Sequence, residues 1–139
     1  MILLDTSGLL SAIDASQKHH TRCAAALMAA EPPLILSPFV LAELDYLLAK
    51  HVGTAAQAAF LAEVARGAYQ LEPFGVADVA AANGVLERHA ALKIGLADAS
   101  IVVLAGRHRT RDVLTLDERH FRSLRTPERK RFRILPFDA

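Results

Sequence analysis

Cysteine is almost missing from this 139-residue sequence, which contains only Cys23. A single cysteine cannot form an internal disulfide, and it excludes a zinc site built from several thiolates. Such low cysteine usage suits a reducing compartment better than secretion. We therefore expect a cytoplasmic protein in which Cys23 is a small residue of the core.

Long hydrophobic runs are also missing: nowhere do about 18 uncharged apolar residues follow one another, as a membrane-spanning helix needs. The apolar start, Met1 to Leu4, meets Asp5 at once and has no basic leader, so we expect neither a signal peptide nor membrane association. Hydrophobic residues make up 53% of the chain, which excludes disorder for most of it. No linker or repeat divides the sequence, and we predict a single domain over residues 1–139.

A large net charge is lacking as well, because the formal value is +1, but the charges are unevenly placed. Residues 1–106 hold six basic and ten acidic residues, whereas residues 107–133 hold ten basic and four acidic ones. Such a basic segment suits a polyanion, although a solvated face explains it equally well. Arg119, Arg122 and Arg125, spaced three apart, are our candidates for contacts with the phosphates of such a polyanion.

Short apolar runs alternate with longer amphipathic segments, which predicts an α/β/α sandwich around a central, mostly parallel sheet. The expected strands are 2–4, 34–36, 69–71, 113–116 and 133–135. The expected helices are 6–30 with a break near 14–17, then 38–53, 54–66, 76–91, 97–107 and 118–124.

Three aspartates occupy equivalent places in this pattern: Asp5 follows the first strand, Asp117 follows the fourth, and Asp98 opens a helix. Ligands of an open parallel sheet bind beyond the carboxyl ends of the strands, where we expect these residues to converge. Each could instead be an ordinary helix cap. That explanation is weaker for Asp98, which shares a helix face with Ile101 and Val102 that should point to the core.

Carboxylates that gather at a buried edge repel one another and have raised pKa values unless a cation lies among them. Oxygen ligands favour Mg²⁺, or Mn²⁺, over Zn²⁺. A fourth acid could come from the helix that begins at Pro38, where Glu43 and Asp45 flank the apolar stripe, and periodicity does not choose between them. The six histidines show no convincing metal-ligand spacing, and we expect them at surface or capping positions.

Four short motifs carry a resemblance to a known family. They are Leu3-Leu4-Asp5-Thr6-Ser7, Ser37-Pro38 followed by Leu41-Ala42-Glu43-Leu44, Gly95-Leu96-Ala97-Asp98-Ala99, and Leu114-Thr115-Leu116-Asp117-Glu118-Arg119-His120-Phe121. In this order and spacing, over nearly the whole length, the chain resembles PIN-domain ribonucleases. More narrowly, it is similar to the VapC toxins of type II toxin–antitoxin pairs.

The resemblance implies five parallel strands and a metal site of four acids, and it selects Glu43 over Asp45. The four acids fall on Asp5, Glu43, Asp98 and Asp117. Hydroxyl positions beside the acids fall on Thr6, Ser7 and Thr115, which capping and strand propensity explain equally well. The resemblance also implies a small VapB-type antitoxin that covers the acidic site, and a homodimer.

The resulting hypothesis is a Mg²⁺-dependent endoribonuclease toxin that hydrolyses structured RNA such as tRNA or rRNA. Asp5 and Asp98 would hold the ion directly, while Glu43 and Asp117 complete the site, bind a second ion or orient water. Two alternatives stay open: a non-catalytic module that binds RNA or protein, and a metal-dependent phosphatase of doubly wound fold. Haloacid-dehalogenase-like phosphatases have a second aspartate two residues after the first, where this chain has Ser7.

Overall fold

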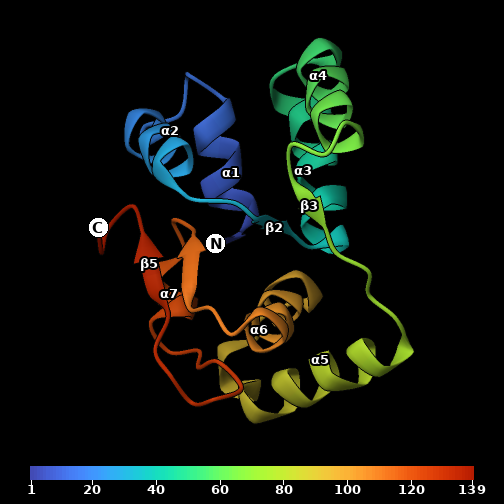
Figure 1. Cartoon of the computed structure of the whole chain (residues 1–139), viewed down its shortest axis with the longest axis vertical. Coiled ribbons are helices and arrows are strands. Elements are labelled where there is room, and N and C mark those ends of the chain that lie inside the picture. The colour runs from blue at the N-terminus through green and yellow to red at the C-terminus, as the bar shows by residue number, and fades with distance from the viewer.

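Five short strands form one sheet in the computed structural model, which describes residues 1–139 (Figure 1). Every pairing is parallel, and the strand order is β3-β2-β1-β4-β5. The strands are β1 (Ile2–Leu4), β2 (Leu34–Leu36), β3 (Gln70–Leu71), β4 (Asp112–Leu114) and β5 (Arg133–Leu135). The predicted α/β class is therefore confirmed, and the sheet is parallel throughout.

Seven α-helices and one 3₁₀ turn connect the strands. They are α1 (Thr6–Ile13), α2 (His20–Ala29), α3 (Pro38–His51), α4 (Thr54–Ala65), α5 (Val76–Arg88), η1 (Ala90–Leu92), α6 (Leu96–His108) and α7 (Glu118–Phe121). Even α3, the longest with 14 residues, falls short of a membrane span, and no other helix has the required length and apolar character.

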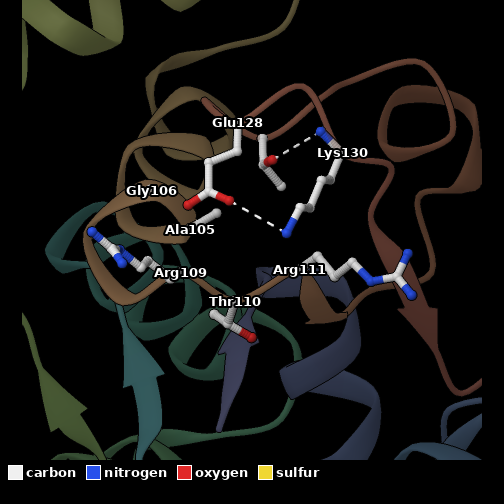
Figure 2. Close-up of a pocket in the computed structure, with 8 residues that line it drawn as sticks. Ala105, Gly106, Arg109, Thr110, Arg111, Glu128 and Lys130 are labelled. Atoms are coloured by element: carbon white, nitrogen blue, oxygen red, sulfur yellow. Dashed lines mark hydrogen bonds and ion pairs between the residues drawn. The ribbon is translucent and has the colours of Figure 1, made fainter.

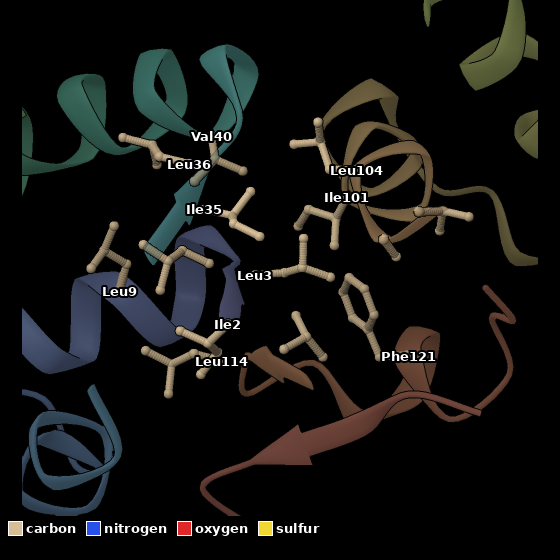
Figure 3. Packing of buried hydrophobic residues seen from close by; sticks show 14 of the residues in the cluster. Ile2, Leu3, Leu9, Ile35, Leu36, Val40, Ile101, Leu104, Leu114 and Phe121 are labelled. Carbon is tan, nitrogen blue, oxygen red and sulfur yellow. The ribbon is translucent and has the colours of Figure 1, made fainter. Parts of the chain in front are cut away.

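The core lies on both faces of the sheet because successive strand residues point to opposite sides. Figure 3 shows Leu3 of β1 lying toward Ile101 of α6 and Phe121 of α7, while Leu9 of α1 lies on the other side of the strands. All four side chains are at most 1% exposed. The strands therefore read as continuous apolar runs, which is typical of a parallel sheet covered by helices on both faces.

The chain reverses its direction of travel across the sheet at β1. From β1 it moves outward to β2 and β3, then returns through α5 and α6 to place β4 on the other side of β1, followed by β5. A reversal of this kind leaves a crevice beyond the carboxyl ends of the two adjacent strands, here β1 and β4. The fold thus prepares a ligand site directly after Leu4 and Leu114.

The fourth strand ends two residues earlier than predicted, at Leu114 rather than Leu116. The Thr115 amide still donates to the Leu135 carbonyl of β5 (3.0 Å), and after Thr115 side-chain hydroxyls replace a neighbouring strand as partners of the backbone amides. The Leu116 amide donates to Ser7 Oγ (3.0 Å), and the Asp117 amide donates to Thr115 Oγ1 (2.9 Å). Two residues therefore separate the strand from Asp117, which was expected to follow it directly.

Helix boundaries differ from the predictions by a few residues. The expected break after α1 spans residues 14–19, where Asp14 accepts hydrogen bonds from the amide and hydroxyl of Ser16 and so forms a local turn. Helix α5 ends at Arg88, short of Ala91, and the 3₁₀ turn follows. Helix α7 ends at Phe121 rather than at residue 124.

Candidate metal centre

The four acids lie along one cleft at the carboxyl edge of the sheet. Asp5 directly follows β1, Glu43 lies on α3, Asp98 is in the first turn of α6, and Asp117 is the N-cap of α7. The cleft has a volume of about 420 Å³, and Thr6, Ser7 and His120 are also among its lining residues. Four separate elements of the fold thus bring these carboxylates to the crevice between β1 and β4.

Asp5 is the most buried acid of the cleft, at 5% exposure. Its Oδ2 accepts a hydrogen bond of 2.6 Å from the Thr115 hydroxyl and one of 3.2 Å from the Ser7 hydroxyl. Burial raises the pKa of Asp5, while the hydrogen bonds from Thr115 and Ser7 act in the opposite direction. The hydroxyls therefore fix the orientation of a carboxylate that the protein interior would otherwise disfavour.

Asp98 shows the cost of crowding these acids. Its side chain is 19% exposed, and burial, followed by repulsion from Asp5 and Asp117, raises its pKa to about 7. The neighbouring Ile101 and Val102 are each 1% exposed, so this face of α6 does point to the core. A divalent cation among the carboxylates would remove the repulsion and restore the ionised form.

Asp117 is held by the short helix that it caps. Its Oδ1 accepts a hydrogen bond from the backbone amide of His120 (3.0 Å), and its Oδ2 lies 2.8 Å from His120 Nδ1. Its own amide is tied to Thr115 Oγ1. Thr115 consequently links two acids of the cleft, Asp5 through its hydroxyl proton and Asp117 through the backbone.

Glu43 and Asp45 have different surroundings in the structure, although the helical period could not distinguish between them. Glu43 is exposed and lines the cleft, whereas Asp45 accepts a 2.7 Å hydrogen bond from Gln57 Nε2 of α4. Asp45 therefore serves the packing of α3 against α4, and Glu43 is available to a ligand at the carboxyl edge.

His120 is the residue of the cleft that the sequence analysis missed. It was expected at a surface or capping position, but its Nδ1 lies 2.8 Å from Asp117 Oδ2 and 3.8 Å from Asp98 Oδ2. Ligand atoms of Asp98, Asp117 and His120 all lie within 4.8 Å of one another, as a metal site requires. Its position three residues after Asp117, one turn along a helix, was the signal in the sequence.

The three hydroxyl residues differ in their surroundings. Ser7 and Thr115 contact each other (3.2 Å between hydroxyl oxygens) as well as Asp5. Thr6 is 3% exposed, and its Oγ1 has no hydrogen-bond partner. The first two therefore position Asp5.

Two of the three candidate arginines, Arg122 and Arg125, have partners within the protein. Arg122 forms ion pairs with Glu118 (2.8 Å) and Asp138 (2.6 Å), and Arg125 donates to three backbone carbonyls that include that of Leu124. Arg119 is exposed and has no ion pair. A phosphate at Arg122 would have to compete with two carboxylates, and contact of these three residues with RNA stays a prediction.

Comparison with known proteins agrees with this geometry. The family model of the PIN domain matches residues 2–127. Ribonuclease VapC26 of Mycobacterium tuberculosis is 42% identical over 135 residues, which are 97% of this chain and the whole of that protein. The chain therefore belongs to the PIN-domain family. Within that family, the extent of the match places it with the VapC ribonucleases.

Two solved structures share the fold. The crystal structure of Mycobacterium tuberculosis VapC20, described as a toxin that cleaves the sarcin–ricin loop, has a TM-score of 0.78 and 21% identity, covering 84% of this chain and 90% of that chain. FitAcB from Neisseria gonorrhoeae has a TM-score of 0.52 and 23% identity, covering 81% and 88%. At such low identity these structures support the fold alone.

Proposed function

We propose that this chain is a Mg²⁺-dependent endoribonuclease toxin and that the four-acid cleft is its active centre. The observation that carries the proposal is the convergence of Asp5, Glu43, Asp98 and Asp117 in one cleft, where burial, together with the neighbouring acids, raises the pKa of Asp98 to about 7. A divalent cation among these acids would offset the repulsion that Asp5 and Asp117 exert on Asp98 and would favour its ionised form.

The donor set fits a hard divalent cation. Carboxylate oxygens prevail, and the single cysteine of the chain, Cys23, is buried in the core away from the cleft. Asp5 and Asp98 would hold Mg²⁺ directly, and Mn²⁺ would satisfy the same ligands. Glu43 and Asp117 complete the site, hold a second ion or orient water. His120 keeps Asp117 in place.

When bound, such an ion acidifies water and offsets the negative charge that develops on a scissile phosphate. The chain itself supplies orientation. Thr115 and Ser7 hold the Asp5 carboxylate in one rotamer, and the α7 amide of His120 does the same for Asp117. Hydrolysis of an RNA phosphodiester by this arrangement needs no covalent nucleophile.

The substrate class follows from the relatives: Ribonuclease VapC26 is a nuclease of RNA by name, and VapC20 is described as cleaving the sarcin–ricin loop. We extend this to structured RNA, either tRNA or rRNA, as the substrate of this chain. A VapB-type antitoxin that covers the acid cleft, a homodimer and a cytoplasmic location complete the proposal. Strand β5 pairs with β4 beyond the matched residues 2–127, which supports one domain over residues 1–139.

The decisive experiment maps new RNA ends after total cellular RNA is incubated with the purified chain and Mg²⁺. EDTA and the Asp98→Asn variant are the controls, because the amide keeps the shape of the side chain while removing its charge. We expect discrete ends that disappear in both controls. These ends would also name the cleaved RNA.

Two outcomes would contradict the proposal. Cleavage that persists in a folded Asp98→Asn protein would remove Asp98 from the active centre. If the folded, partner-free protein gives no metal-dependent RNA ends, a non-catalytic binding module is favoured. If that protein instead releases inorganic phosphate from a phosphomonoester, a phosphatase is favoured.

A further inference from the structure

A second charged surface lies away from the acid cleft, around the loop of residues 125–131. We call it the basic surface, and it comprises Arg88, Arg109, Arg111, Arg125, Arg129, Lys130 and Arg131. Figure 2 shows one of its hollows, with Arg109, Arg111 and Lys130 around it. A second hollow is lined by Arg88, His89, Arg125 and Arg129, and it has no hydrophobic lining residue.

Almost none of this positive charge is neutralised by the protein. Glu128 is the single acid that lines either hollow, and it pairs with Lys130 at 3.4 Å. The guanidinium groups of the six arginines have no carboxylate within ion-pair distance. His89 lines the same hollow as Arg88 and Arg125, and burial, together with these two positive charges, lowers its pKa.

The fold accepts an energetic cost to hold these arginines together. Arg109 and Arg129 have φ angles of 52° and 64°, in the left-handed region where glycine is the favoured residue. Arg125 and Arg131 pair in an antiparallel bridge, so the backbone brings two residues of like charge opposite each other. A surface with no binding role would be more stable with glycine or a neutral residue at such positions.

The basic surface and the acid cleft lie at opposite edges of the sheet. Arg111 directly precedes β4, whereas Asp117 lies beyond the carboxyl end of the same strand. Arg109, at the end of α6, follows Asp98 by eleven positions, which is about 16 Å at the helical rise. A ligand that touches both regions must therefore be a long polyanion.

We propose that the basic surface binds the phosphate backbone of the RNA substrate at a distance from the bond that is cut. This inference rests on the proposed ribonuclease function. The arginines contact a part of the RNA that is not cleaved, and they select long or structured molecules over short oligonucleotides. Such a surface attracts phosphates through its density of positive charge and does not recognise particular bases.

The test uses the whole chain with Asp98→Asn, so that RNA is bound and not cut. In this background we compare the parent with Arg109→Gly/Arg129→Gly, using end-labelled bulk tRNA and fluorescence anisotropy at several salt concentrations. Glycine suits both left-handed positions, so the melting temperature should stay the same or rise. The matched control, Lys50→Gln/Arg66→Gln, removes the same charge from exposed positions on α3 and at the end of α4.

We expect the glycine variant to lose about tenfold in affinity near 0.1 M salt and its salt slope to fall by about two, one for each lost phosphate contact. The control should change by less than about twofold. Equal losses in the two variants would overturn the proposal, because net charge alone would then explain them. Unchanged RNA binding by the glycine variant would also overturn it, and would leave an acidic protein segment as the partner that fits these arginines.

Cleavage assays separate this inference from the function on which it rests. In the background with an intact Asp98, the glycine variant should cut a short oligonucleotide as fast as the parent and a long structured RNA about tenfold more slowly. A parent that cuts no RNA while the arginines still govern RNA binding contradicts only the nuclease function. A glycine variant that cuts both substrates like the parent contradicts only the present inference.

Discussion

The acids and the arginines lie at opposite edges of one sheet, and the protein holds them in different ways. Asp5 is 5% exposed and receives hydrogen bonds from Thr115 and Ser7, whereas Arg109 and Arg129 are exposed and have no carboxylate partner. A metal ion needs oxygens at fixed separations, but a nucleic acid backbone responds to the number of nearby charges. Small displacements should therefore be costly at the acid cleft and mild at the basic surface.

Replacing Gly8 by alanine should have the largest effect on stability. A Cβ at this position of α1 would lie 2.4 Å from the Leu114 carbonyl oxygen and 2.8 Å from the Thr115 amide nitrogen. Because both atoms belong to the backbone, α1 must move away from β4 and take Asp5 with it. We expect a loss of about 3 kcal/mol in the free energy of unfolding, measured by urea denaturation, and a loss of RNA cleavage.

The matched control is Gly84→Ala in the middle of α5. There a Cβ would meet only the Arg88 side chain, at 3.4 Å. Alanine should stabilise this helix by about 0.5–1 kcal/mol. If Gly8→Ala were equally harmless, the close contact of α1 with the end of β4 would not be what holds Asp5 in place.

The stability of the metal-free protein should fall as pH rises, because of Asp98. Its pKa is raised to about 7 in the folded protein from an ordinary 3.8, so the folded state holds a proton that the unfolded chain has released. The stabilising contribution is present below pH 4 and disappears as pH rises from 4 to 7. Allowing for partial exposure, we expect a loss of about 2 kcal/mol, measured by denaturation in EDTA.

Two comparisons isolate the contribution of Asp98 to this pH dependence. Asp98→Asn should be more stable than the parent at pH 8 in EDTA and should show a smaller slope between pH 4 and 7, while Asp5, whose pKa burial also raises, keeps its own contribution. Added Mg²⁺ should raise the stability of the parent at pH 8, but have little effect on the variant. A parent whose stability does not change over this range would show that burial and the neighbouring acids do not raise the pKa of Asp98 in the folded protein.

The Thr115→Val variant should have the next largest effect on stability. Valine has the same shape, but it can neither donate to Asp5 Oδ2 nor accept from the Asp117 amide. We expect the free energy of unfolding to fall by about 1.5 kcal/mol, because a buried hydrogen bond is lost. Cleavage should be about 10- to 100-fold slower, which is the usual effect of removing a residue that orients metal ligands. Calorimetric titration with Mn²⁺ should show weaker binding.

Ser100→Ala provides the control for this variant. The Ser100 hydroxyl is buried and bonds to Ser37 Oγ (2.7 Å) and to the Ala97 carbonyl (2.6 Å), without contacting an acid. Its loss should lower stability by a similar amount and leave Mn²⁺ affinity unchanged. Equal effects of both variants on metal binding would mean that Thr115 acts only through general packing.

Local sequence patterns predicted most of the fold. Uninterrupted apolar runs such as Ile2–Leu4 identify strands covered on both faces, and Pro38 and Gly53 delimit a helix whose bounds are almost those observed. The end of β4 was placed two residues too late because Thr115 and Leu116 look like strand residues. What ends the strand is the Ser7 hydroxyl, which is distant in sequence.

The site shows the same division between local and long-range information. Local pattern predicts three of the acids, because each follows a strand or opens a helix: Asp5, Asp98 and Asp117. The choice of Glu43 over Asp45 needed the family resemblance. His120 was missed because its role depends on α7 folding back beside Asp98. The basic charge of residues 107–133 was predicted, but the surface that these residues form with Arg88 of α5 depends on how the end of α6 and the 125–131 loop pack together.

Replacing Gly106 by alanine tests the basic surface, where small displacements should be mild, and should have the smallest effect on stability. A Cβ there would lie 2.6 Å from Pro127 Cγ, only slightly farther than the 2.4 Å of the worst contact at Gly8, but the obstacle is a side-chain ring on an exposed loop. The ring can move outward, and alanine favours the helix, so we expect a net loss of about 1 kcal/mol or less. Cleavage of a short oligonucleotide should be unchanged, while tRNA binding weakens as Arg125 and Arg129 shift with the loop. A cost as large as that of Gly8→Ala would show that the 125–131 loop is as rigid as the acid cleft, so that shape as well as charge would govern binding at the basic surface.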